Sequence, residues 1–171
     1  HIPQVYGSIP FNRSGRRTST LWLLEKAPIY SEGLGAALAG KVMPKLTESW
    51  KGAGSIRQLN WLWQIANLWD PMQVEGVNRT LLHPEFLRVE GGLLRTIELM
   101  PNGESAPKLA ELGKLWQPWQ KHARMGIAQI LEKICNQLLK EEIKTATQLI
   151  AILDEALRTA GQKQFLNCNY L

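Results

Sequence analysis

The stretch from Ser55 to Glu98 constrains the fold more than any other part of the chain. Its first part places apolar residues three and four positions apart, the spacing that gathers them on one face of an α-helix. Ser55 and Gln58 have the Ser-x-x-Gln spacing of a capping box, which predicts that the helix begins there. Gly76 is predicted to end it, because glycine readily adopts the left-handed conformation that follows a helix. The apolar residues of this face are Ile56, Leu59, Leu62, Trp63, Ala66 and Trp69.

A loop and a β-hairpin are predicted after this helix. Residues 77–84 have the composition of a loop, and residues 86–89 and 93–97 are short and rich in strand-forming side chains. The glycines at positions 91 and 92 suit a tight hairpin turn between them. The central stretch therefore predicts a helix, a loop and a hairpin, in that order.

The flanking sequence predicts a mainly α fold with small β elements, an α+β class. Residues 5–6 and 20–24 are predicted to pair as strands, and residues 31–40 form a glycine-rich linker before a short helix at about 44–51. Three further helices follow, the last with a Thr145–Gln148 capping box and an end near Gly161. Their apolar faces are Leu109, Leu112, Leu115, Trp116 and Trp119; Ile127, Ile130, Leu131, Ile134 and Leu138; and Ala146, Leu149, Ile150, Leu153 and Leu157. The tryptophans at helical spacing are interpreted as core.

Length and composition indicate one globular domain. The chain has 171 residues, of which 44% are hydrophobic and 20% charged. No apolar run approaches the roughly 20 residues that span a bilayer, so no membrane contact is predicted. Cys135 and Cys168 are interpreted as reduced thiols of a cytoplasmic protein. The first residue is not methionine, and we expect the chain to be a fragment of a longer protein.

No catalytic, metal or cofactor site is predicted from the residues themselves. His1, His83 and His122 are scattered without the spacing of metal ligands. Glu98 follows a predicted strand and could approach Glu85 as a carboxylate pair, but two surface carboxylates are the favoured interpretation.

One dense basic run, containing Arg13, Arg16 and Arg17, is the candidate contact for phosphate groups. The net charge is +5, and Ser14 and Gly15 mark this run as an exposed loop. A water-facing loop is favoured over a phosphate-binding site, which remains the alternative.

Residues 77–89 resemble the catalytic loop of eukaryotic-type protein kinases, His-Arg-Asp-Leu-Lys-Pro-Glu-Asn-x-Leu-Val, with one residue inserted after Leu81. Residues 92–98 resemble the strand that leads into the kinase Asp-Phe-Gly motif. Further similar segments are residues 3–7 and 21–25, which resemble the two strands before the kinase hinge. Residues 112–113 resemble the Leu-Gly of the next large kinase helix, and residues 145–149 resemble the start of the last one. The resemblance implies a fold like the helical C-lobe of a kinase, with an N-terminal β-hairpin and a second hairpin after the degenerate loop.

The positions that phosphoryl transfer needs are altered. Kinases use aspartates, an asparagine and a lysine to accept a proton and to hold magnesium and ATP. Here the His-Arg-Asp positions carry Asn78, Arg79 and Thr80, the lysine position His83, the asparagine position Phe86, and Asp-Phe-Gly begins with Glu98. The strands of the glycine-rich loop are missing, and only a short turn replaces the activation segment. The resemblance thus implies a pseudokinase.

Over the whole chain the sequence resembles the kinase-like region of cyanobacterial metal-dependent protein serine/threonine phosphatases of the 2C class. Tryptophan-rich strings carry this resemblance, notably residues 1–7, 21–25, 57–66 and 112–116. It divides residues 1–171 into a hinge-like part (1–30), a helical lobe (41–160) and a tail (161–171). It implies a non-catalytic regulatory or protein-interaction domain without a cofactor, whose partner is the phosphatase domain of the same polypeptide. One alternative is a basic module that binds phosphate groups through Arg13, Arg16 and Arg17, for which nucleic acid is a disfavoured partner. The other is a residual nucleotide-binding site that uses Glu98.

Overall fold

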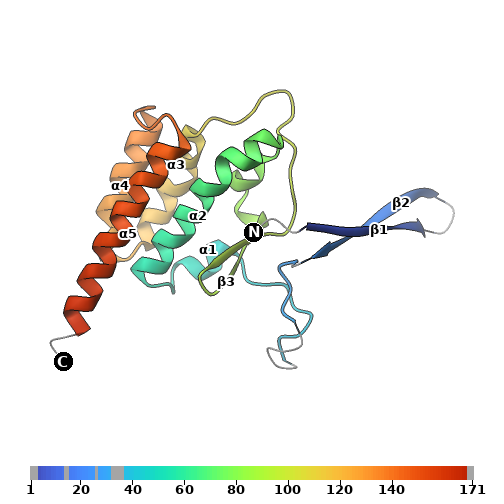
Figure 1. The fold of residues 1–171 in the computed structure, drawn as a ribbon, viewed down its shortest axis with the longest axis horizontal. Coiled ribbons are helices and arrows are strands. Elements are labelled where there is room, and N and C mark those ends of the chain that lie inside the picture. Colours follow the sequence, from blue (N-terminus) through green and yellow to red (C-terminus); the bar gives the residue numbers. More distant parts are fainter. Residues whose placement is uncertain (1–3, 14–15, 26, 32–36, 169–171) are drawn as a thin grey trace.

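The computed structural model describes the backbone of residues 4–13, 16–25, 27–31 and 37–168, and side-chain surroundings for 27–31 and 37–162. The fold is mainly helical with two small antiparallel sheets, as the sequence predicted (Figure 1). The α-helices are α1 (Leu46–Trp50), α2 (Ser55–Val74), α3 (Ala110–Trp116), α4 (Met125–Leu139) and α5 (Ala146–Cys168). The 3₁₀ helices are η2 (Asn78–Leu82), η3 (Pro84–Phe86) and η4 (Gln117–His122), and the strands are β1 (Gln4–Arg13), β2 (Arg16–Glu25), β3 (Leu87–Glu90) and β4 (Leu93–Thr96).

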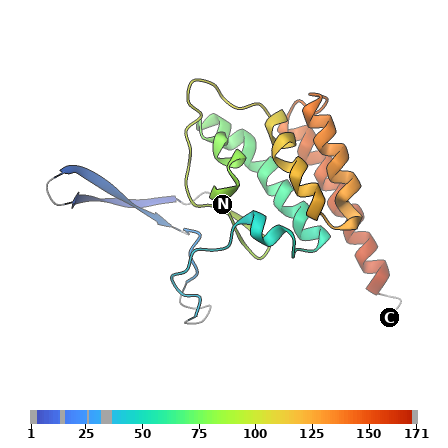
Figure 2. The same ribbon diagram turned by 180° about the vertical axis from the view of Figure 1, so that it is seen from behind.

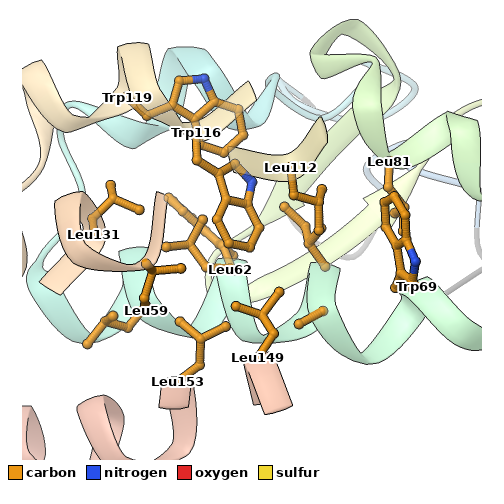
Figure 3. Close-up of a cluster of buried hydrophobic side chains, with 14 of the residues drawn as sticks. Leu59, Leu62, Trp69, Leu81, Leu112, Trp116, Trp119, Leu131, Leu149 and Leu153 are labelled. Carbon is orange, nitrogen blue, oxygen red and sulfur yellow. The ribbon is translucent and has the colours of Figure 1, made fainter. Parts of the chain in front are cut away.

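The core forms around α2. This helix packs against α5, while α3 packs against α4, and Figure 3 shows leucines and tryptophans from these helices meeting between them. Leu59, Leu62, Trp116, Leu149 and Leu153 are all fully buried. Each such side chain contributes about 1.5–3 kcal/mol by leaving water. The predicted apolar faces therefore build most of the core, and Trp69, Trp116 and Trp119 belong to it. Trp63 is only partly buried and packs against the core, and the prediction was wrong for Ile56, which is exposed.

The N-terminal strands β1 and β2 form a hairpin that stands apart from the helices in both ribbon views (Figures 1 and 2). Val5 is the Cα partner of Leu24, so the predicted pairing is confirmed. The strands are longer than predicted: Arg13 lies in β1, and Arg16 and Arg17 lie in β2 rather than in a loop. Positions 14 and 15 lie outside the described residues, as do the side-chain surroundings of all three arginines.

The predicted turn glycines are confirmed. Helix α2 continues through Pro71 to Val74 and is followed by Gly76, whose φ is +69°. Gly91 has φ +57° in the two-residue turn between β3 and β4. Residues with a side chain rarely adopt such φ values, so glycine suits both turns.

The two capping boxes have opposite outcomes. At α5, Thr145 Oγ1 accepts the Gln148 N–H (3.2 Å) and Gln148 Oε1 accepts the Thr145 N–H (3.3 Å), as predicted. At α2 the prediction was wrong, because the residue before the helix is Gly54 and no side chain caps it. The Gln58 side chain is fully buried instead, and its Nε2 donates a hydrogen bond to Trp50 O.

The predicted end of the last helix at Gly161 was also wrong. Helix α5 runs to Cys168, so the expected tail is helical at 161–168, while 169–171 lie outside the described residues. Gly161 does not have the positive φ of a helix-ending glycine. A glycine inside a helix costs only about 1 kcal/mol relative to alanine, which does not by itself end the helix.

Candidate functional site

The altered kinase-like positions lie where the 78–86 loop, formed by η2 and η3, meets the segment that follows β4. Thr80 Oγ1 accepts the Met100 N–H at 2.7 Å, and the Asn102 N–H donates to Gly76 O at 2.8 Å. These hydrogen bonds join two segments that are about 20 residues apart in the chain.

Arg79 also links the same two segments by hydrogen bonds. Its backbone N–H donates to Asn102 Oδ1 (3.0 Å), its Nε donates to Asn102 O (3.0 Å), and its Nη2 donates to Ser105 O (3.2 Å). The guanidinium is therefore occupied by backbone carbonyls and supports the loop. Asn102 was missed by the sequence reasoning, which assigned it only to a turn.

Thr80, which the sequence resemblance aligns with the kinase proton acceptor, is fully buried, and its hydroxyl accepts the Met100 N–H. A threonine hydroxyl has no basic lone pair comparable to that of a carboxylate, and this one is already engaged. Asn78 is also fully buried, and its amide has no hydrogen-bond partner among the described residues. Neither side chain is placed to accept a proton from a substrate.

His83, Glu85 and Phe86 form a small cluster on the outer side of the loop. His83 Nδ1 lies 3.2 Å from Glu85 Oε1, and the rings of His83 and Phe86 are 5.6 Å apart. A backbone N–H and the His83 side chain, in that order, lower the pKa of the Glu85 carboxyl. Glu85 is therefore ionised at neutral pH and is a poor general acid.

Glu98 lies after β4 with an exposed side chain. It makes no hydrogen bond or ion pair with the described part of the chain. In that part, no three histidine, cysteine, aspartate or glutamate side chains come close enough to hold a metal ion. Cys135 is buried, which raises the pKa of its thiol.

The basic run is described only through its backbone. Arg13 and Arg16 are Cα partners across the hairpin, so the register places two cationic residues directly opposite one another. Among the described residues, one groove of about 540 Å³ is lined by Trp69, Lys108 and Lys144, between α2 and the α4–α5 turn.

Gln58 is a second polar residue whose position the sequence did not reveal. Its Nε2 donates to Trp50 O (2.7 Å) and His122 O (3.1 Å), and its Oε1 accepts the Arg124 N–H (2.9 Å). This buried amide joins the end of α1, the start of α2 and the start of α4. The spacing of Gln58 from Ser55 matches a capping box. No local sequence signal distinguishes a capping glutamine from one that is buried and hydrogen-bonded to distant residues.

Comparisons of the chain with protein-family models, with curated proteins and with solved structures each find no match. Within the described residues, every helix is too short or too polar to cross a membrane.

Proposed function

We propose that the chain is a non-catalytic, pseudokinase-like domain that regulates or positions a protein serine/threonine phosphatase carried on the same polypeptide. The observation that carries this proposal is the use of the Thr80 hydroxyl as an acceptor for the Met100 N–H. At the position where a kinase has a proton-accepting aspartate, the chain has a buried residue that holds two segments together.

The surrounding groups support the same interpretation. Phe86 replaces a magnesium ligand and packs beside His83, and Arg79 is bound to the 102–105 backbone. Glu98 alone retains a group that could bind a metal, whereas phosphoryl transfer uses several ligands and a lysine. The arrangement of a helix, loop, hairpin and contacting segment is retained while the chemistry is lost, as expected of a domain kept for its surface.

The non-catalytic part is tested by the thermal midpoint of unfolding in millimolar ATP and magnesium, with magnesium chloride at the same ionic strength as the control. A ligand that binds only the folded state raises this midpoint. We expect no rise. A rise that disappears in Glu98→Gln would contradict the proposal and establish a residual nucleotide site.

The regulatory part is tested on the full-length polypeptide. Metal-dependent hydrolysis of a phosphoserine peptide is measured with residues 1–171 present and deleted, at matched phosphatase concentration. We expect deletion to change the rate several-fold, because a regulatory domain shifts the phosphatase between states of different activity. Equal rates would contradict a regulatory role.

The register of the first hairpin favours one competing function, a phosphate-binding module. Arg13 and Arg16 are Cα partners in this register, so the backbone brings two cationic residues to the same end of the hairpin. Binding of this kind weakens steeply as salt is added. Salt-insensitive binding of a protein partner, unchanged in Arg16→Gln and Arg17→Gln, would exclude it.

A further inference from the structure

The hairpin of β1 and β2 has two open strand edges. Its sheet consists of these two strands, and no other element of the described chain pairs with either of them or packs extensively against them. Figures 1 and 2 show the hairpin projecting away from the helices. A two-stranded hairpin by itself is at best marginally stable in water, because independent stability needs more strands or a packed face. The hairpin therefore calls for a further element that covers it.

The outer edge of β1 is poorly suited to pairing with another strand. Pro10 has no backbone N–H, and proline within a sheet is confined to edge strands, first residues and bulges. The register shifts by one residue between Val5 and Gly7, so Tyr6 is an extra residue in β1. Such a bulge bends the strand and protects its edge. We therefore assign β1 to the rim of the sheet and expect an added strand beside β2.

The outer edge of β2 lacks these protective features over residues 19–25. This stretch contains no proline or glycine, and Glu25 is its only charged residue. Its threonine and tryptophan are strand-forming residues. The other irregularity of the register lies towards the turn, beyond Ser19. An edge of this kind is a template for pairing with another strand.

The register of the hairpin leaves the charges of β2 without opposite charges. The Cα partner of Glu25 is the uncharged Gln4, and the Cα partner of Arg16 is Arg13. Arg17 falls within the irregular part and has no Cα partner in β1. The strand β1 thus supplies no counter-charge at either end of β2.

A second copy of β2 supplies the missing charges. When two identical strands pair antiparallel about a two-fold axis, the residue at the axis lies opposite its own counterpart. With Leu21 at the axis, Arg17 of each copy lies opposite Glu25 of the other. In the same register Thr20 lies opposite Trp22. Opposite charges, and an aromatic residue opposite a β-branched one, stabilise antiparallel pairs.

We propose that two copies of this chain associate through the outer edges of β2, antiparallel and with Leu21 at the two-fold axis. The two hairpins then form one four-stranded sheet in the order β1-β2-β2-β1. The self-complementary charges of β2 identify the partner strand as a second copy. The dimer does not use the kinase-like positions and does not depend on the regulatory role proposed above.

Single cysteines test the register, in a Cys168→Ser background in which the remaining Cys135 is buried. Directly opposite Cα atoms lie about 4.5–5.5 Å apart, within the range of a disulfide. We expect Leu21→Cys to form a disulfide-linked dimer under mild oxidation. Leu23→Cys should not link by itself, because the two copies of position 23 would lie about 13 Å apart. Mixed with Ser19→Cys, which lies opposite it, Leu23→Cys should give a linked heterodimer.

Charge reversal tests the identity of the partner. Glu25→Arg and Arg17→Glu each replace the two attractive pairs of the dimer with repulsive ones. Sedimentation equilibrium should therefore show dimerisation weakened by about tenfold or more in each variant. An equimolar mixture of the two variants should dimerise again, because each variant then meets the opposite charge. Glu132→Arg and Lys133→Glu make the same changes at exposed positions on α4 and should leave dimerisation unchanged.

Three outcomes would overturn the proposal. The first is a wild-type chain that stays monomeric at millimolar concentration, and the second is a dimer that neither charge reversal weakens. The third is a mixture of the two charge variants that stays monomeric although circular dichroism shows each variant to be folded like the wild type. None of these measurements involves phosphatase activity, so failure of the dimer is distinguishable from failure of the regulatory role.

Discussion

The two ends of α2 differ in how far their nearby polar side chains are hydrogen-bonded within the chain. At the C-terminal end, Arg79 and the Thr80 hydroxyl are occupied by the segment that follows β4. At the N-terminal end, Arg57 has no partner in the described structure and the Trp61 N–H is unpaired. Donors satisfied within the chain stabilise the fold, whereas a buried donor without a partner costs stability.

A sequence resemblance at one end of α2 does not indicate which polar groups at that end are free to bind a ligand. The 78–86 loop was singled out only by a sequence resemblance to a catalytic motif, and its hydrogen bonds are mostly internal. Asn78 is the exception at that end, since its buried amide has no partner. The N-terminal end carries no catalytic motif, but it lies beside two cavities, both lined by the exposed Arg57.

The largest effect is expected from Gln58→Leu, which tests how the N-terminal end is fixed. The substitution leaves Trp50 O, His122 O and the Arg124 N–H without their side-chain partner. We expect the free energy of unfolding to fall by about 2–4 kcal/mol, measured by urea denaturation. Gln129→Leu, at an exposed position on α4, is the matched control and should leave stability nearly unchanged. A loss shared by both variants would show that the buried network contributes nothing specific.

A smaller effect is expected at the opposite end from Thr80→Val, compared with Thr96→Val. Both threonines are fully buried, but only Thr80 Oγ1 accepts a hydrogen bond, from the Met100 N–H, whereas Thr96 Oγ1 is unpaired. Thr80→Val should lower the free energy of unfolding by about 1–3 kcal/mol, and Thr96→Val should leave it unchanged or raise it. Equal losses in thermal or urea unfolding would remove the structural role that we assign to Thr80.

The smallest effect is expected from Glu85→Gln and depends on pH. The folded-state pKa of Glu85 is lowered, so its ionised form contributes stability above the ordinary value of 4.5, and this contribution is lost as the pH falls through the folded pKa. The carboxylate is 54% exposed, so solvent screening keeps the effect small. Urea midpoints should show wild type slightly more stable than Glu85→Gln at pH 7, with the difference shrinking as the pH falls below 4.5. A difference that grew towards low pH would reverse the assigned sign.

Sequence alone determined the features that depend on nearby residues. The three-and-four spacing of apolar side chains predicted α2, α4 and α5. The glycines at 76 and 91 marked turns because their backbone conformation is a local property. Thr145 and Gln148 cap α5 because each needs only the other. The order of helix, loop and hairpin was predictable for the same reason.

Only the tertiary structure decided which polar groups are engaged. Gln58 binds carbonyl and amide groups as far as 66 residues away, so a spacing that matched a local cap gave the wrong role. Thr80 acquires its structural role from Met100, and Arg57 and Trp61 line the same cavity as Gly91, in a turn 30 or more residues further along. Hydrogen bonding and burial depend on which neighbours the fold supplies, and a local pattern of residues does not contain that information.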